Sequence, residues 1–151
     1  MGFQLSLRWY AISYIAGFFI ALSMMKYFVK RSFLWRSNIS PMEVEATDRI
    51  LTFLIIGVIV GGRLGYVLFY NFDYYAAQPL DIIRVWDGGM SFHGGFLGVI
   101  LAGTIFCYLN TCNIFSVADL ISLATPPGLF LGRLANFANA ELWGAPTALP
   151  W

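Results

Sequence analysis

The chain alternates between long apolar stretches and short polar connections. The apolar stretches run from about Trp9 to Val29, from about Ile50 to Tyr70, from about Phe92 to Leu109 and from about Phe115 to Asn136. Each is close to the roughly 20 residues that an α-helix needs to cross a bilayer. The pattern therefore predicts an all-α, polytopic transmembrane protein with about four spans, and residues 1–151 are expected to form a single transmembrane domain.

Prolines and glycines modify these predicted helices at defined positions. Pro126 and Pro127 lie inside the fourth stretch, where a proline removes a backbone hydrogen bond and clashes with the preceding turn. We therefore expect a kink or a break there. Gly57, Gly61 and Gly65 recur every fourth residue in the second stretch, and such a row lets a neighbouring helix approach closely.

Lysine and arginine are unevenly distributed between the connections. The connection after the first span carries Lys30, Arg31, Arg36 and Arg49, with Lys26 at its edge. The next connection carries Arg84 against Asp73, Asp81 and Asp87. Because basic connections stay in the cytoplasm, the first connection is predicted to be cytoplasmic and the N-terminus to lie outside. The fourth span then ends on the outer side.

Composition narrows the class of protein further. Hydrophobic residues make up 59% of the chain and charged residues 11%, whereas a soluble domain carries about 25% charged residues. The net charge of +1 gives no reason to expect nucleic acid binding. Cys107 and Cys112 are five apart, which suits neither a redox pair nor a zinc site, and both are expected to be reduced. No motif indicates a metal or a cofactor.

Arg63 lies within the second apolar stretch, in "GGRLGYVLFYN", where a charge is costly and usually functional. Arg63, Tyr66 and Tyr70 are spaced i, i+3 and i+7, so they share one helix face. We expect this face to help bind a substrate in the outer half of the membrane. The alternative is that Arg63 is a structural partner of a backbone carbonyl or of an acid elsewhere.

His93 is the only histidine, and it lies at the predicted outer start of the third span. In "RVWDGGMSFHGGFLG" it is bracketed by Gly88, Gly89, Gly94 and Gly95. Such glycines permit unusual backbone and close approach of a ligand, and a histidine exchanges its proton near neutral pH. We predict a functional role for His93, with a purely structural role as the alternative.

The end of the fourth stretch, "GRLANFANAELWG", is unusually polar for a membrane helix. It places Arg133, Asn136, Asn139 and Glu141 within nine residues. If the helix continues, Arg133, Asn136 and Glu141 project within one broad arc. A guanidinium fork with amides beside it suits a phosphate, so a phosphate site is predicted here. Alternatively, Glu141 neutralises Arg133.

Arg63, His93 and Arg133 belong to three different predicted spans. The orientation from connection charges, which did not use these residues, places all three toward the outer leaflet. A shared site on that side is the simplest account. The residues alone also fit an anion channel or transporter built on broken helices, or a non-catalytic scaffold.

Four blocks of the sequence resemble one family, the bacterial prolipoprotein diacylglyceryl transferases. "GRLANFANAELWG" closely resembles the family signature in its Gly-Arg, Asn-Phe, Asn, Glu and Gly positions. "RVWDGGMSFHGGFLG" resembles the family's histidine-glycine block, while "GGRLGYVLFYNF" and "LRWYAISYIAGF" resemble its second and first helices. The blocks occur in order and cover nearly the whole chain, which is more specific than any single motif.

The resemblance implies a multi-pass enzyme of the bacterial inner membrane. Such enzymes transfer the diacylglyceryl group of phosphatidylglycerol to the thiol of the lipobox cysteine in a prolipoprotein signal peptide, the first step of lipoprotein maturation. By resemblance, Arg133 is the phosphatidylglycerol-binding arginine, with Asn136 and Glu141 as essential neighbours. His93 and Tyr10 fall on the family's functionally important histidine and tyrosine.

The chain also departs from the family pattern. Members have about seven spans, and their later half supplies further helices and another essential arginine, which this chain does not contain. We therefore interpret the chain as an N-terminal portion of the family fold or a truncated product. This interpretation puts its activity on its own in question.

A mechanism consistent with these residues divides the work among them. Arg133 holds the phosphate and stabilises the charge that grows on it as it departs. Because a free thiol has a pKa of about 8.5, a base such as His93 helps to form the thiolate. The other predicted phosphatidylglycerol-binding residues, Arg63, Tyr66, Tyr70 and Asn139, assist or orient the headgroup. Asn136, predicted as a catalytic residue, also orients it.

Overall fold

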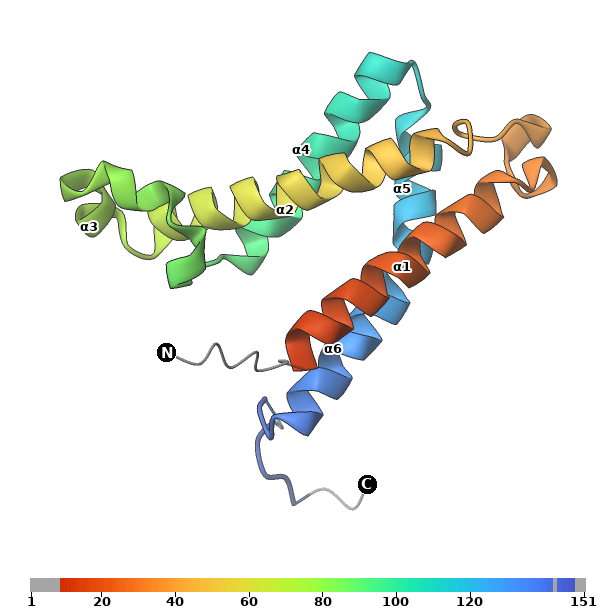
Figure 1. The fold of residues 1–151 in the computed structure, drawn as a ribbon. Coiled ribbons are helices and arrows are strands. Elements are labelled where there is room, and N and C mark those ends of the chain that lie inside the picture. The colour runs from red at the N-terminus through yellow and green to blue at the C-terminus, as the bar shows by residue number, and fades with distance from the viewer. Residues whose placement is uncertain (1–8, 143, 149–151) are drawn as a thin grey trace, which may run out of the picture.

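The computed structural model describes residues 9–142 and 144–148, and all regular secondary structure in this part of the chain is helical (Figure 1). Its α-helices are α1 (Trp9–Val29), α2 (Ala46–Phe69), α3 (Phe72–Ala77), α4 (Phe92–Asn110), α5 (Ile114–Ala124) and α6 (Pro126–Ala138). Short 3₁₀ helices lie in the connections: η1 (Ser32–Leu34), η2 (Arg36–Asn38), η3 (Pro79–Ile83) and η4 (Val85–Asp87). The predicted all-α class is confirmed.

Four segments are long and apolar enough to span a membrane, as predicted: α1, α2, α4, and α5 with α6 taken together. The first and third agree with the predicted bounds to within one residue. The second begins at Ala46, four residues before the apolar stretch. The reason is that Ala46 and Thr47 are buried among neighbouring helices, while Asp48 pairs with Lys26 of α1 at 2.9 Å.

The fourth span is broken, as its two prolines predict. Helix α5 ends at Ala124, and α6 begins at Pro126. Pro126 and Pro127 occupy the first turn of α6. Backbone N–H groups in the first turn have no partner within the helix, so the N–H that proline lacks costs no helical hydrogen bond there. Thr125 between the helices keeps helical backbone angles, so the break changes the hydrogen bonding while the chain continues in the same general direction.

The buried core lies at one end of the molecule, where α1, α2, α4 and α5 meet (Figure 1). Its most completely buried large side chains are Met25, Ile50, Phe106, Val117 and Leu120. The α1–α2 connection and the α4–α5 turn close this end of the helices. From here the helices extend as two pairs, α2 with α4 and α1 with α6, which diverge in Figure 1.

The α2–α4 pair is joined through glycine backbone. A methyl group added at Gly98 would overlap the carbonyl oxygen of Gly57, and one added at Gly94 would overlap that of Gly61. Gly65 lies against Gly94 in the same row. The predicted close approach of a helix to the glycine row is therefore confirmed, and α4 is the helix that approaches.

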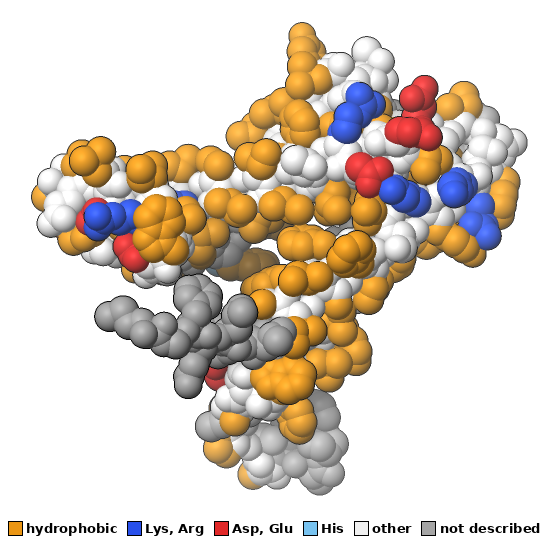
Figure 2. All heavy atoms as spheres, viewed as in Figure 1, with side chains coloured by type: hydrophobic (Ala, Val, Ile, Leu, Met, Phe, Trp, Pro, Cys, Tyr) orange, Lys and Arg blue, Asp and Glu red, His pale blue; other side chains and the backbone are white. Residues whose placement is uncertain are grey.

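The outer surfaces of the helices are apolar along their length. Figure 2 shows hydrophobic side chains over the long faces of α1 and α2, while most of the charged side chains in this view gather around the α1–α2 connection. Large apolar side chains such as Phe19, Leu68 and Phe137 are more than half exposed. An apolar surface with most of its charges near its ends fits a protein that is surrounded by lipid.

Candidate functional site

The C-terminal end of α6 and the first turn of α1 bring four predicted polar residues together. The Tyr10 hydroxyl donates to Glu141 Oε2 at 2.5 Å, and Asn136 Nδ2 donates to the same hydroxyl. Asn139 also lies within hydrogen-bonding reach of this hydroxyl. Tyr10 is thus the centre of a polar group made by residues 126 or more positions away in the sequence.

A tight turn after α6 brings Glu141 back toward the helix. The N–H of Ala140 donates to the Phe137 carbonyl at 3.0 Å, and that of Glu141 donates to the Asn136 carbonyl at 2.9 Å. Ala140 and Leu142 have φ angles of 55° and 54°, a region that non-glycine residues seldom adopt. The Tyr10–Glu141 hydrogen bond helps to stabilise this unfavourable backbone.

Arg133 lies on α6 beside this polar group and keeps its donors free. With Asn136, Ala140 and Glu141 it lines a small cavity of about 290 Å³. The guanidinium makes no hydrogen bond or ion pair with any other residue in the ranges 9–142 and 144–148. The predicted alternative, neutralisation by Glu141, is not seen, because Glu141 is bound by Tyr10 instead. An unpaired guanidinium beside an amide suits an anionic ligand.

Arg63, in contrast, has its donors occupied by backbone carbonyls. Its side chain is 4% exposed. Nε donates to Ile82 at 2.8 Å and Nη2 to Asp81 at 2.7 Å, while Nη1 donates to both Gly88 and Gly89. The Arg63 Cζ also lies 5.1 Å from the ring centroid of Tyr75 in α3. This arrangement matches the structural alternative for Arg63, since the guanidinium fixes the α3–α4 connection onto α2.

Further contacts hold the same connection. The ring of Tyr66 leaves no room for a side chain at Gly89, whose φ is 79°. Tyr66 also stacks on Tyr70, with ring centroids 5.6 Å apart. The Tyr74 hydroxyl donates to an Asp81 carboxylate oxygen at 2.6 Å, and this hydrogen bond raises the pKa of Tyr74. The predicted tyrosine face of α2 therefore packs against the connection.

His93 lies in the first turn of α4, directly after this connection. Its imidazole is exposed, and its ring meets that of Phe92 edge-on with centroids 5.7 Å apart. Ser91 caps the helix, because its hydroxyl accepts from the N–H of Gly94 at 3.2 Å and its own N–H donates to Gly62 at 2.9 Å. The position of His93 is therefore fixed by Arg63 and Ser91 through the backbone.

The predicted site residues thus form two groups. Tyr10, Arg133, Asn136, Asn139 and Glu141 lie together on the α1–α6 pair, whereas Arg63, Tyr66, Tyr70 and His93 belong to the α2–α4 pair (Figure 1). Among the described residues no hydrogen bond or ion pair joins one group to the other. A single shared site therefore stays a prediction.

Sequence reasoning missed Ser91 as a residue that positions the histidine. The signal was present, since a serine three residues before a glycine at a predicted helix start is a typical N-cap. Within the described ranges, no three histidine, cysteine or acidic side chains are grouped so that they could hold a metal ion.

Comparisons with known proteins give one consistent result. The family described as prolipoprotein diacylglyceryl transferase matches residues 1–151. A phosphatidylglycerol–prolipoprotein diacylglyceryl transferase of Cereibacter sphaeroides is 55% identical over 150 residues, which cover 99% of this chain and 74% of that protein. Proteins of the same name from Ruegeria pomeroyi and Mesorhizobium japonicum are 51% and 48% identical, over 99% and 97% of this chain.

The lengths of these relatives differ from the length of this chain. The matched region is 51% of the protein from Ruegeria pomeroyi and 51% of the one from Mesorhizobium japonicum. The chain therefore spans about half the length of these curated relatives. All of the site residues described above lie within the half of these relatives that the chain matches.

Proposed function

Because the chain belongs to the prolipoprotein diacylglyceryl transferase family, we propose that its spans take part in moving a diacylglyceryl group from phosphatidylglycerol to the cysteine thiol of a prolipoprotein. The observation that carries this proposal is the unpaired guanidinium of Arg133 beside the Asn136–Tyr10–Glu141 hydrogen bonds. The family match favours transfer over the anion channel or transporter that the composition also allowed.

In the proposed reaction, the thiolate sulfur attacks the carbon of the diacylglycerol part that is joined to the phosphate oxygen. The carbon–sulfur bond forms as the bond from that carbon to the phosphate oxygen breaks, and glycerol phosphate leaves with the bonding electrons. Arg133 stabilises the negative charge on the departing phosphate, because a charge-assisted contact is strong where water is scarce. Asn136 and Asn139 orient the headgroup, and the acyl chains stay among apolar helix faces.

Tyr10 and Glu141 have a shared part in this proposal. Glu141 accepts the Tyr10 hydrogen bond, so the tyrosine hydroxyl is turned with its lone pairs toward Asn136. This fixes the amide of Asn136 next to the cavity that Arg133 lines. Both residues therefore keep the phosphate site in shape, and Glu141 also limits the net positive charge that Arg133 brings to it.

His93 is proposed as the base that accepts the thiol proton. Because it lies on the α2–α4 pair, the prolipoprotein cysteine must reach the first turn of α4 while the lipid phosphate lies at α6. Arg63 contributes by holding the connection that precedes His93, since its donors are occupied by four carbonyl oxygens. Tyr66 supports the same connection from α2, and Tyr70 stacks on Tyr66.

We place the site in the outer leaflet of the bacterial inner membrane, with the N-terminus outside. The support for this orientation is the basic α1–α2 connection, which the positive-inside rule puts in the cytoplasm. Labelling of single cysteines from outside intact cells tests it. A cysteine at Ala140 should react with a membrane-impermeant maleimide and one at Asn38 should not. The reverse labelling pattern would invert the topology.

The experiment that tests the function measures the mass of a lipobox-cysteine peptide incubated with the protein in membranes containing phosphatidylglycerol. A diacylglyceryl gain is expected when these spans are present together with the remaining half of the relatives' length, and Arg133→Gln should then reduce its rate about 100-fold or more, as for other stabilisers of transition-state charge. Arg49→Gln is the matched control, because Arg49 is exposed at the opposite end of the molecule. Equal rates in the two variants would remove Arg133 from the mechanism.

Binding of phosphatidylglycerol provides a second readout that does not depend on turnover. The wild-type chain should retain the lipid in detergent, and Arg133→Gln should lose it. If the chain neither transfers the group nor retains the lipid, the proposed function of these spans is wrong.

A further inference from the structure

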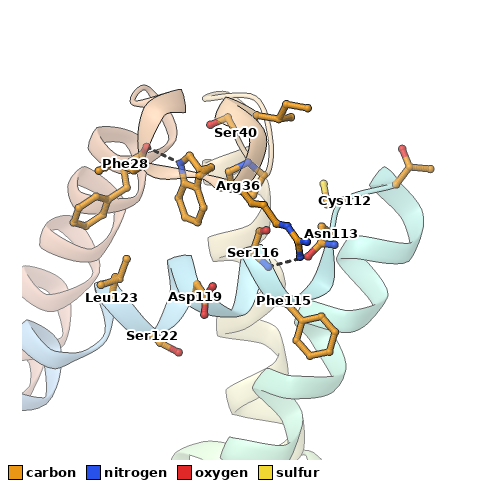
Figure 3. A pocket seen from close by; sticks show the side chains of 15 residues that line it. Phe28, Arg36, Ser40, Cys112, Asn113, Phe115, Ser116, Asp119, Ser122 and Leu123 are labelled. Atoms are coloured by element: carbon orange, nitrogen blue, oxygen red, sulfur yellow. Dashed lines mark hydrogen bonds between the residues drawn. The ribbon is translucent and has the colours of Figure 1, made fainter.

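A large cavity among the described residues lies at the end opposite the candidate site. Its volume is about 1050 Å³, and it opens between the α1–α2 connection, the α4–α5 turn and the first half of α5 (Figure 3). Trp35, Arg36 and Ser40 come from the connection, while Ser116 and Asp119 come from α5. The transfer mechanism uses none of these residues.

The walls of this pocket are held by hydrogen bonds. Trp35 Nε1 donates to the Phe28 carbonyl at 3.0 Å, and the Ser40 hydroxyl donates to the carbonyl of Val29. On the other side, the side chain of Asn113 accepts from the N–H of Ser116 at 3.0 Å (Figure 3). The pocket is therefore formed in the absence of any ligand.

Two charges of opposite sign face this pocket without a partner. Arg36 reaches from the connection toward the first turn of α5, and Asp119 lies one turn further along the same helix (Figure 3). Within the ranges that the structure describes, neither makes a hydrogen bond or an ion pair. In the same region Lys26 and Asp48 do pair, at 2.9 Å.

An unpaired Asp119 is costly at its depth in the membrane. It lies five residues after the start of α5, about 7 Å along the helix axis, inside the fourth span. An acid within a span usually marks a functional site. The thiol of Cys112, also in the pocket, contributes no charge, because burial raises its pKa even though Arg49 lowers it somewhat.

The apolar part of the pocket continues onto the lipid-facing surface. Phe115 and Leu123 line it from α5, and their side chains are 81% and 49% exposed. A ligand in the pocket would therefore have polar groups near Arg36 and Asp119 and apolar chains running along α5. A membrane lipid whose headgroup carries both a negative and a positive charge has this arrangement of polar groups and apolar chains.

We propose that this pocket binds an aminophospholipid of the leaflet at this end, with Arg36 on its phosphate and Asp119 on its primary ammonium. The phosphate and ammonium of such a headgroup belong to one molecule, which therefore carries a partner for each of the two unpaired charges that line the pocket. Binding neutralises Asp119 within the span and lets the connection and α5 be held together by lipid. The site is separate from the phosphatidylglycerol site at Arg133.

The test compares three short-chain lipids by native mass spectrometry of the protein released from detergent micelles. Dioctanoyl phosphatidylethanolamine should be retained about tenfold better than dioctanoyl phosphatidylglycerol, which lacks the ammonium, as expected for one charge-assisted contact of about 1.4 kcal/mol. The phosphatidylcholine analogue, whose nitrogen has no N–H, should fall between them. Measuring in an Arg133→Gln background separates this binding from the candidate site.

Two variants distinguish the parts of the pocket. Asp119→Asn should remove the preference for the ethanolamine lipid and leave glycerol lipid binding unchanged, whereas Arg36→Gln should weaken retention of all three. Lys30→Gln and Glu43→Gln are matched controls, because both side chains are exposed and neither lines the pocket. Neither pocket charge has a hydrogen-bond or ion-pair partner among the described residues, so their substitution should not lower the thermal unfolding temperature.

Three results would overturn the proposal. They are equal retention of the ethanolamine and glycerol lipids, an ethanolamine preference that survives Asp119→Asn, and retention that Arg36→Gln leaves intact. A preference for the glycerol lipid that depends on Arg36 alone would indicate a general anion site instead. None of these readouts uses group transfer, so a failure here is distinct from a failure of the proposed function.

Discussion

The α2–α4 pair buries its arginine and joins its helices through glycine backbone, whereas the α1–α6 pair leaves its arginine unpaired and has only looser glycine contacts. Arg63 donates to four carbonyl oxygens, while Arg133 has no such partner among the described residues. Between α1 and α6, a methyl group at Gly17 would lie 3.3 Å from the Gly128 Cα. Two arginines that look equivalent in the sequence therefore have different surroundings, and the donors of the unpaired one are free for a ligand.

The largest change in stability is expected from a substitution that pushes α2 and α4 apart. In Gly98→Ala the new methyl would overlap backbone of α2, which cannot move aside as a side chain can. We expect a loss of about 3 kcal/mol or more in the free energy of unfolding, measured by thermal or denaturant unfolding in detergent. The control is Gly132→Ala, since no atom lies within 4 Å of its added methyl. Similar losses in both variants would refute the tight α2–α4 contact.

Removing the cation of Arg63 should be nearly as harmful. Arg63→Gln removes the donors of four backbone carbonyl oxygens around the buried guanidinium, and losing such a set of hydrogen bonds costs about 2–4 kcal/mol. Hydrogen exchange should speed up in residues 78–91 and stay unchanged in α6. Arg63→Lys should recover part of the protection, because one cation remains. Unchanged exchange in residues 78–91 would show that the guanidinium does not hold this connection.

On the α1–α6 pair, loss of the Tyr10 hydroxyl should have a smaller effect on stability and a larger one on function. Tyr10→Phe removes one donor and one acceptor, which costs about 1 kcal/mol. Glu141 and Asn136 would lose their common partner, so phosphatidylglycerol retention should fall while unfolding changes little. Tyr14→Phe, an exposed tyrosine on the same helix, is the control. A stability loss without a binding loss would make the polar group purely structural.

The smallest effect is expected at Gly128. A methyl group there would lie 4.0 Å from the Gly17 Cα, an ordinary van der Waals distance. Gly128→Ala should therefore change the free energy of unfolding by less than about 1 kcal/mol, with the helix preference of alanine partly offsetting any crowding. The unfolding curve would be compared with that of Gly98→Ala. A large loss would mean that the two pairs pack alike.

The sequence was sufficient to predict what depends on local pattern. The length of the apolar stretches predicted the four spans, the glycine spacing of α2 predicted the close approach of some neighbouring helix, and Pro126–Pro127 predicted the break in the fourth span. That α4 is the approaching helix came from the structure. The early start of α2 was missed, because Ala46 and Thr47 are buried by helices distant in the sequence. An apolar pattern carries no information on such contacts.

The partners of the polar residues were harder to predict. Spacing showed that Arg63 shares a face with Tyr66, but its carbonyl partners lie 18 to 26 residues later, in irregular backbone whose course no periodicity determines. The resemblance identified Tyr10 as important, and its hydrogen bonds to Asn136 and Glu141 follow from the pairing of α1 with α6. Whether His93 and Arg133 act in one reaction depends on how a bound substrate lies between them, and helix periodicity carries no information on a bound substrate.

The break at Thr125 gives α6 the mechanics of a lever. The helix of 13 residues after the break is about 20 Å long. Because its near end is the joint, a rotation of about 10° there would carry its far end sideways by about 3 Å, comparable with the length of a hydrogen bond. The Tyr10 hydroxyl holds that far end through its hydrogen bonds with Asn136 and Glu141. Small changes of angle at the prolines would thus be magnified at the proposed phosphate site, and the hydrogen bonds of a single tyrosine on α1 oppose them.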